Sequence, residues 1–422
     1  MTDRLVVIGL GYVGLPLCHA AAQVGLSVVG LDRSEQVVRG LAAGRSHVDD
    51  LTDVDVAAMA AAGFRATCDP RVLDDADTVV ICVPTPLSPE GGPDLDAVVS
   101  SLTTVAAHLR AGQLVVLEST TYPGTTDEIA RPILEAGGLT AGVDFHLAFS
   151  PERIDPGNVQ FGMRNTPKVV GGQTPRCTEA AAAFYGRFVD TVVRARGTRE
   201  AEMAKLLENT YRHVNIALVN EMARFSHELG IDLWDAIRCA STKPFGFQAF
   251  YPGPGVGGHC IPIDPNYLSY KVKSDLGYPF RFVELAQEIN AAMPQYVVQR
   301  TQSLLNDRSR AVRGSAVLLL GVTYKRDIAD QRESPAKPIA ALLHELGAEV
   351  SFHDPFVETW TVGSQTYTRV ADVEAAVAQA DVAILLQAHT AYDLSDLVGR
   401  SRLFFDTRGA LGNIDAGHVD RL

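Results

Sequence analysis

The chain offers little positive charge to a polyanion, since 37 lysines and arginines stand against 50 aspartates and glutamates, for a net charge of −13. We therefore expect no nucleic-acid partner. A long apolar run is also lacking, because the short one at the N-terminus is broken by glycines, and so we expect neither a signal peptide nor a membrane span. With 422 residues, two or three globular domains are expected.

Cysteine is scarce as well, and none of the six cysteines forms a CxxC pair. Scattered thiols in mostly apolar runs favour a reduced, cytoplasmic protein, with neither a disulfide framework nor a metal site. Five cysteines are predicted to pack in the core: Cys18, Cys68, Cys82, Cys177 and Cys239. Cys260 differs, because it follows a glycine-rich segment.

Short β-branched runs alternate with Ala/Leu-rich helical segments in both the first and the last part of the chain. Such alternation is typical of βαβ units around a parallel sheet. We expect an α/β fold with two Rossmann-like, doubly wound domains that are not sequence repeats. The runs are 4–9, 26–31, 77–83 and 113–117, then 315–320, 348–352, 381–386 and 402–405.

A single long helix is predicted from residue 198, because no glycine or proline occurs before Gly230. Its apolar residues recur at steps of three and four and form one stripe over eight or nine turns. Such a helix suits a spine between domains or a dimer interface. The stripe consists of Met203, Leu207, Tyr211, Val214, Leu218, Met222, Phe225 and Leu229. We divide the chain into residues 1–197, 198–305 and 306–422.

The segment GLGYVG at residues 9–14 follows a strand and opens a helix. Glycines there allow a tight turn, close approach of a pyrophosphate and helix–strand packing, and the helix N-terminus faces the phosphates. Asp32 ends the second strand, where its carboxylate would accept from ribose hydroxyls and repel a 2′-phosphate, which favours NAD over NADP. Arg33 either weakens that preference or is a solvated surface residue.

Residues 244–265, PFGFQAFYPGPGVGGHCIPIDP, contain too much glycine and proline for a helix or a regular strand. A rigid surface loop is the plain structural alternative, but four aromatic residues argue against full exposure. Gly255, Gly257 and Gly258 would leave N–H groups free to approach a ligand. Cys260 is then an accessible nucleophile if its thiolate is stabilised. We expect no dyad with His259, because adjacent side chains point apart.

Three polar residues are candidates to assist Cys260. Asp264 would hold or activate a water, or else would only cap a turn. Lys205 and Asn209 share one face of the long helix, opposite the apolar stripe. In a generic helix that face would simply be solvated.

Taken in order, nine motifs resemble the UDP-glucose/GDP-mannose dehydrogenase family over nearly the whole chain. They are GLGYVGLP (9–16), VPTPL (83–87), ESTTYPGTT (118–126), FSPERIDPGN (149–158), KLLEN (205–209), GPGVGGHCIPIDP (253–265), GVTYKRDIADQRESP (321–335), HDP (353–355) and FDTRG (405–409). The resemblance implies an N-terminal NAD domain, a central dimerising helix and a C-terminal nucleotide-sugar domain. It also implies four-electron oxidation of C6 of a UDP-hexose with two NAD per sugar.

The resemblance also implies roles for single residues. Cys260 is the expected nucleophile, Lys205 and Asn209 stabilise the oxyanion, and Asp264 orients water, while Thr120 and Glu152 lie near the reacting carbon. We expect cofactor contacts at Gly9, Gly11, Tyr12, Val13, Gly14, Asp32, Arg33, Thr85, Thr120 and Arg332. We expect substrate contacts at Glu152, Arg153, Lys205, Asn209, Phe250, Tyr251, Gly257, Lys325 and Arg408.

The expected chemistry explains why a cysteine stands in this loop. An aldehyde formed by the first oxidation would be captured as a thiohemiacetal, and the second oxidation would give a thioester that water hydrolyses. Lys205 and Asn209 would stabilise the thiohemiacetal oxyanion. A two-electron β-hydroxyacid-type dehydrogenase would need no such cysteine, and a non-catalytic sugar-nucleotide-binding protein would need none of these groups.

The sugar is expected to be UDP-N-acetylglucosamine, on the similarity of the cysteine loop and of SPERIDPGN to that subgroup. UDP-glucose is the next candidate, followed by UDP-N-acetylmannosamine. Ile154 and Gln248 stand where that subgroup would carry an acid and a methionine, which leaves the C2 substituent open.

Overall fold

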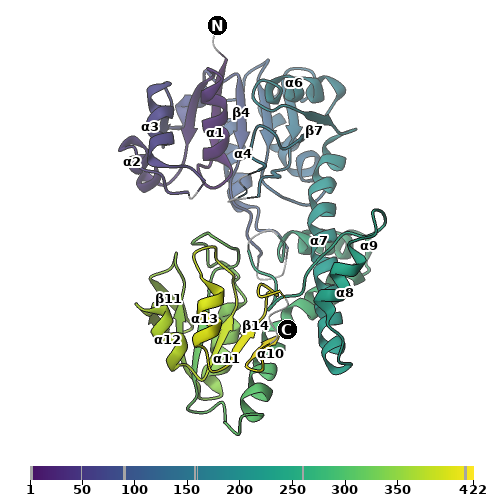
Figure 1. The fold of residues 1–422 in the computed structure, drawn as a ribbon. Coiled ribbons are helices and arrows are strands. Elements are labelled where there is room, and N and C mark those ends of the chain that lie inside the picture. Colours follow the sequence, from purple (N-terminus) through teal and green to yellow (C-terminus); the bar gives the residue numbers. More distant parts are fainter. Residues whose placement is uncertain are drawn as a thin grey trace. The chain divides into compact units, whose positions relative to one another are not determined.

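The computed structural model describes residues 3–48, 50–88, 92–155, 158, 160–258, 261–412 and 416–422. The chain forms two compact units (Figure 1), the first from residues 1–208 and 266–278, the second from 209–265 and 279–422. In the described part of the chain, no helix is both long and apolar enough to cross a membrane.

The first unit contains an eight-stranded sheet in the order β3-β2-β1-β4-β5-β6-β7-β8. Paired strands from β1 to β6 are parallel, whereas β7 is antiparallel to β6. The strand order reverses direction at β1, which predicts a ligand crevice at the carboxyl ends of β1 and β4. The strands are β1 (Arg4–Ile8), β2 (Ser27–Leu31), β3 (Arg65–Thr67), β4 (Thr78–Ile81), β5 (Leu114–Leu117), β6 (His146–Phe149), β7 (Lys168–Gly172) and β8 (Val192–Arg194).

Helices cover both faces of this sheet, because alternate residues of each strand are buried on opposite sides. Leu5 and Val7 of β1 pack with α1, α3 and α6, and Val6 and Ile8 pack with α4 and α5. The first part of the chain is therefore doubly wound, as predicted. Its helical elements are α1 (Gly14–Gln23), α2 (Glu35–Ala42), α3 (Asp53–Ala61), η1 (Pro70–Leu73), α4 (Asp96–Ala106), η2 (Thr126–Ala130), α5 (Arg131–Glu135), α6 (Pro175–Tyr185) and most of α9 (Asp264–Leu276).

The second unit contains a five-stranded parallel sheet in the order β10-β9-β13-β14-β15. Alternate residues of β9 pack against α10 and α11 on one face and against α12 and α13 on the other, which confirms the second doubly wound domain. Its strands are β9 (Ala316–Leu320), β10 (Glu349–His353), β13 (Val382–Leu385), β14 (Phe404–Asp406) and β15 (Val419–Arg421), beside an antiparallel hairpin of β11 (Thr359–Val362) and β12 (Gln365–Thr368). Its helices are α8 (Leu233–Ala240), α10 (Arg281–Asn306), α11 (Ala336–Glu345), α12 (Val373–Gln379) and α13 (Leu394–Arg400).

Side-chain caps fix where several helices begin. Thr52 and Asp55 form a capping box at the start of α3, in which each side chain bonds the other residue's backbone N–H. Thr174 caps α6 directly before Pro175, whose missing N–H costs nothing at a first helical position. Each cap contributes about 1 kcal/mol to the helix that it starts.

Helix α7 (Thr198–Glu228) is the predicted long helix. Six of the eight residues of the predicted apolar stripe are exposed, whereas Val214 and Met222 are partly buried against the core. Leu218 and Leu229 are 53% and 67% exposed, whereas Glu202, His213 and Asn220 on the polar side are buried. The buried polar groups are paired, as when the Asn220 amide donates to the Asn290 side chain at 2.9 Å. An exposed apolar seam, defined as Met203, Leu207, Tyr211, Leu218 and Phe225 of α7 and Leu229 directly after it, therefore lies along the helix.

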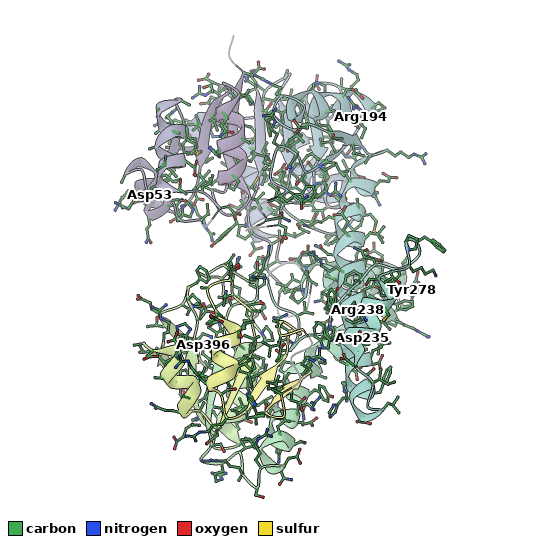
Figure 2. The ribbon with its side chains drawn as sticks, in the orientation of Figure 1. Asp53, Arg194, Asp235, Arg238, Tyr278 and Asp396 are labelled. Carbon is green, nitrogen blue, oxygen red and sulfur yellow. The ribbon has the colours of Figure 1, made fainter. Side chains whose placement is uncertain are left out.

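The prediction that five cysteines are buried is wrong for two of them. Cys18, Cys82 and Cys177 are buried and free, but Cys68 and Cys239 are exposed. Cys68 directly follows the edge strand β3. Cys239 lies in the last turn of α8, beside the ion pair of Asp235 and Arg238, both labelled in Figure 2. Apolar sequence neighbours do not reveal which face of a short element a residue occupies.

Candidate active site

The glycine loop after β1 has the geometry that a dinucleotide turn requires. Gly9 has a φ of +90°, and a Cβ there would lie 2.7 Å from the Cys82 carbonyl oxygen. A Cβ on Gly14 would lie 1.9 Å from the Gly9 carbonyl oxygen, so both positions need glycine for packing. A Cβ on Gly11 would meet nothing within 4 Å. This open side at the start of α1 suits the close approach of a pyrophosphate.

Two side chains hold this loop from the second strand and the segment beyond it. Asp32 accepts from the Leu10 and Ser34 backbone amides, each at 2.8 Å. His47, which the sequence did not single out, contacts the Leu10 carbonyl oxygen through Nε2 at 2.7 Å. Each carboxylate oxygen has further lone-pair capacity, so Asp32 can hold the loop and still accept from a ribose hydroxyl. Arg33 is exposed beside it.

The next two predicted residues meet at the carboxyl ends of β4 and β5. The Thr85 hydroxyl donates to the Thr120 carbonyl oxygen at 2.8 Å. The Thr85 carbonyl oxygen in turn accepts from the hydroxyl of Tyr267, a buried residue of α9. The structure therefore brings Thr85 and Thr120 together at the predicted crevice.

Glu152 follows β6 and is buried next to a lysine that the sequence did not single out. The Nζ atom of Lys168 lies 3.3 Å from Glu152 Oε2. Arg153, expected to contact substrate, forms an ion pair with Glu208 at 2.7 Å and donates to the Pro167 carbonyl oxygen at 2.6 Å. Arg153 is thus held in place from α7 and from the segment before β7.

A buried carboxylate of α7 fixes the loop that follows β5. Glu202 accepts from the backbone amides of Gly124 and Thr126, at 2.5 and 2.8 Å, and from the Thr126 hydroxyl at 2.7 Å. Burial raises the pKa of Glu202 to about 7. Glu202 lies one turn before Lys205 on the helix, so the same helix that presents Lys205 also anchors the loop of Thr120.

In the second unit, the structure brings two predicted catalytic residues into direct contact. The Asn209 amide donates to Asp264 Oδ2 at 2.6 Å. Asp264 is buried and is the first residue of α9, whereas Asn209 lies one turn after Lys205 on α7. Cys260 and His259 lie outside the described residues.

The interpretation of the second glycine loop needs a correction. A Cβ on Gly257 would lie 2.7 Å from both the Glu333 carbonyl oxygen and Tyr324 Cβ, and one on Gly258 would lie 2.7 Å from the Tyr324 ring. The Gly258 amide donates to the Arg332 carbonyl oxygen at 3.1 Å. At these positions the missing side chain makes room for protein atoms, so the expected free N–H groups are not found at Gly258.

This packing places the cysteine loop against the segments that carry the predicted substrate residues. A Cβ on Gly253 would lie 3.1 Å from Arg408 Nη1, and the Arg408 guanidinium donates to the Leu386 carbonyl oxygen at 2.7 Å. Desolvation lowers the pKa of Arg408 to about 10, which leaves it charged at neutral pH. The Lys325 carbonyl oxygen accepts from the Thr323 hydroxyl at 2.9 Å. Lys325 follows β9 and Arg408 follows β14, two strands of one parallel sheet that are separated by β13.

The remaining predicted contacts of the second unit are occupied by protein partners. Arg332, expected at the cofactor, pairs with Asp330 at 2.6 Å. Tyr251 stacks on Trp234 with ring centroids 5.6 Å apart, and the indole N–H of Trp234 is buried without a partner in the described chain. Phe250 lies edge-on to Tyr211 at 5.7 Å.

Comparison with known proteins matches three successive segments of the chain to one family. Family models of the UDP-glucose/GDP-mannose dehydrogenase family match residues 3–189 as its NAD binding domain, 199–292 as its central domain and 318–413 as its UDP binding domain. The protein is an NAD-dependent nucleotide-sugar dehydrogenase. A glycine loop built for a dinucleotide and a second doubly wound unit agree with that class. The chain belongs to the UDP-glucose/GDP-mannose dehydrogenase family.

Three relatives illustrate this membership. UDP-N-acetyl-D-mannosamine dehydrogenase of Methanocaldococcus jannaschii is 32% identical, with 97% of this chain and 92% of the relative covered. NDP-N-acetyl-D-galactosaminuronic acid dehydrogenase of Ralstonia nicotianae is 34% identical, with 96% and 95% covered. The solved structure of UDP-D-ManNAc dehydrogenase from Pyrococcus horikoshii has a TM-score of 0.89 at 31% identity, with 99% of this chain and 98% of that chain covered.

Proposed function

We propose that the protein oxidises the C6 hydroxymethyl group of a UDP-N-acetylhexosamine to a carboxylate, in four electrons, through a covalent intermediate on Cys260. The observation that carries the proposal is the contact between Asn209 and Asp264 at 2.6 Å. These are the expected oxyanion donor and the expected water-orienting acid, and Asp264 follows Cys260 by four residues. A non-catalytic binding protein would have no need to bury this pair.

In this proposal, different side chains carry out the successive steps of the reaction. NAD, held at the glycine loop of residues 9–14 and by Asp32, would supply the hydride acceptor for both oxidations of C6, two per sugar. The Cys260 thiolate attacks the aldehyde carbon, and its C–S bond forms as the carbonyl oxygen becomes an oxyanion held by Lys205 and Asn209. After the second oxidation, water oriented by Asp264 attacks the thioester carbon. The C–S bond then breaks, and the carboxylate leaves while the thiol is restored.

The sugar assignment rests on a feature that the relatives share. The names of the Methanocaldococcus and Ralstonia relatives both contain an N-acetylated amino sugar, of the manno and the galacto series respectively. The sequence resemblance favours the gluco epimer. The N-acetyl group at C2 is common to all three, so we assign an acetamido sugar and leave its epimer to a substrate panel.

We further infer that the working enzyme contains two copies of the chain. The exposed apolar seam of α7 includes Tyr211, Phe225 and Leu229, each about half to two-thirds exposed. Large contiguous apolar surface of this kind is typical of protein interfaces. A second copy would cover the seam with the same residues, as a two-fold interface does.

Single-turnover stoichiometry with the Cys260→Ala variant tests the mechanism. Native enzyme should release two NADH per sugar, whereas Cys260→Ala should release at most one and form no uronate, because no thioester can form. Cys239→Ala is the matched control, since it removes an exposed thiol of the same unit. Intact-mass analysis of native enzyme quenched during turnover should show a sugar-nucleotide adduct that Cys260→Ala lacks. Release of two NADH by Cys260→Ala at a near-native rate would rule out the covalent route.

A substrate panel tests the sugar separately. The panel comprises UDP-N-acetylglucosamine, UDP-N-acetylmannosamine, UDP-N-acetylgalactosamine and UDP-glucose. One acetamido sugar should exceed UDP-glucose in kcat/KM by ~10²-fold or more, because a site that bonds a polar substituent strongly rejects an analogue lacking it. If UDP-glucose is the best substrate, the acetamido assignment is wrong while the oxidation chemistry stands.

A further inference from the structure

Three buried charged side chains meet at the carboxyl ends of β5 and β6 and at the start of β7. The Lys168 ammonium lies 2.7 Å from Glu118 Oε1 and 3.3 Å from Glu152 Oε2. The Lys168, Glu118 and Glu152 side chains are 5%, 0% and 12% exposed. One ammonium therefore serves two carboxylates, of which only Glu152 belongs to the proposed active site.

Glu118 has the more deeply buried carboxylate, and apart from Lys168 its hydrogen-bond donors are neutral. The Tyr185 hydroxyl donates to Glu118 Oε1 at 2.6 Å, and the Cys82 thiol lies 3.6 Å from Oε2. Burial raises the pKa of Glu118. Burial opposes the charge of Lys168, but the two carboxylates together raise its pKa above the usual range. Glu118 thus fixes the ammonium in position.

Glu152 is surrounded by groups that favour its charged form. Burial alone would raise the pKa of Glu152, but the Lys168 charge, the Ile154 amide and the Lys205 charge together hold that pKa below its usual range. The Ile154 N–H donates to Oε1, whereas Lys168 contacts Oε2, so each oxygen has its own partner. Two partners on two oxygens define the plane of the carboxylate.

Stability alone does not account for such a cluster. Removing charges from water costs several kcal/mol per ion, and buried ion pairs replaced by apolar side chains of similar size often leave a protein equally stable. A buried cluster that ends on a candidate catalytic carboxylate is more readily explained by a task at that carboxylate.

We propose that Lys168, anchored by Glu118, is a positioning residue that orients Glu152 and keeps it ionised for proton transfer at C6. This proposal rests on the proposed function. Lys168 itself touches neither substrate nor cofactor in this assignment, and it acts only through Glu152. Its replacement should therefore lower kcat and leave the KM values for NAD and for the sugar within about twofold.

The two anchors predict pH effects of opposite sign. Loss of Lys168 removes positive charge from Glu152 and should move the acid limb of the kcat/KM profile upward by about 1–3 pH units. Glu118→Gln removes a competing negative charge and should move the same limb downward. If the cluster only stabilised the fold, both variants would lose activity, but their acid limbs would not move in opposite directions.

The experiment compares pH profiles of NADH release for native enzyme, Glu118→Gln, Lys168→Met and the double variant. The double variant guards against misfolding, because it does not leave Glu118 charged and unpaired. The acid limb of the double variant should lie above that of Glu118→Gln, by the same upward shift that Lys168→Met produces relative to native enzyme. Lys168→Arg should restore the acid limb, since the charge returns. Arg300→Met is the control, because it removes a comparably buried cation, 6% exposed, that pairs with Asp420 in the other unit, and it should not move the limb.

Titration by infrared spectroscopy provides a readout that does not depend on turnover. With ¹³C-labelled glutamate, the band lost in Glu152→Gln should titrate at higher pH in the double variant than in Glu118→Gln. Equal titration in these two proteins, or an acid limb that moves the same way for Glu118→Gln and Lys168→Met, would overturn the positioning role. If native enzyme releases no NADH from any sugar of the panel, the proposed function fails, while the infrared comparison still decides the role of Lys168.

Discussion

The Gly11→Ala substitution should separate cofactor binding from folding. Gly11 does not have a positive φ, and a Cβ there would meet no heavy atom within 4 Å, so the folded chain accepts alanine without strain. Alanine also restricts the unfolded chain, which stabilises the fold by about 0.4–1 kcal/mol. For a unit of this size that corresponds to a rise in Tm of about 1–4 °C.

The same methyl group should weaken NAD binding. It would occupy the open side of the loop, where the pyrophosphate must approach the backbone closely. An added methyl in a tight contact costs about 1–3 kcal/mol. The Kd for NAD should therefore rise about 5–150-fold, at 1.4 kcal/mol for each factor of ten. The variant would be more stable than native protein and yet bind its cofactor less tightly.

Calorimetric titration with NAD and thermal unfolding without ligand measure the two effects. Gly137→Ala is the matched control, because a Cβ there also meets nothing within 4 Å, and it should leave the NAD affinity unchanged. Gly14→Ala should behave in the opposite way, since its Cβ would lie 1.9 Å from the Gly9 carbonyl oxygen and should destabilise the fold. A native NAD affinity in Gly11→Ala would show that the pyrophosphate does not cross this loop.

Two further predictions concern helix α7. A charge at Leu218, which is 53% exposed, should break the association of two copies. Light scattering of Leu218→Glu should therefore give half the native mass. The control Val143→Glu, at an exposed position outside α7, should not change the mass. Burial raises the pKa of Glu202 from 4.5 to about 7, so its contribution to stability is complete below pH 4.5 and is lost as the pH rises through 7. Between these values the free energy of unfolding, measured in urea relative to Glu202→Gln, should fall by about 3 kcal/mol; a difference that does not vary with pH would contradict it.

The fold could be predicted from sequence because its signals are local. The β-branched runs became strands within one or two residues of their predicted bounds, and the chain without glycine or proline from residue 198 became α7. Exposure could not be predicted in the same way. Most of the apolar stripe of α7 is exposed to solvent in this chain. Only the fold shows that Glu202 and Asn220 lie on the buried side of the helix.

The candidate site was predictable only where a motif carried it. The motifs named Thr85, Thr120, Asn209 and Asp264 as site residues without pairing them. The structure adds the hydrogen bonds that join Thr85 to Thr120 and Asn209 to Asp264. Lys168 and His47 were missed, because each acts on a residue far away in sequence and belongs to no short pattern. The expectation of a free N–H at Gly258 was wrong for the same reason, since that amide donates to the carbonyl oxygen of Arg332, from a distant segment.

The discontinuity of the first unit has a consequence for how the protein is made. Residues 266–278 belong to that unit, and the Tyr267 hydroxyl reaches the Thr85 carbonyl oxygen across 182 residues of sequence. A ribosome must therefore synthesise the chain past residue 278, including the first stretch of the second unit, before the cofactor-binding half can close its own structure. A fragment that ends after β8 would lack this segment, so dissection of the protein into working pieces has to keep α9 with the first unit.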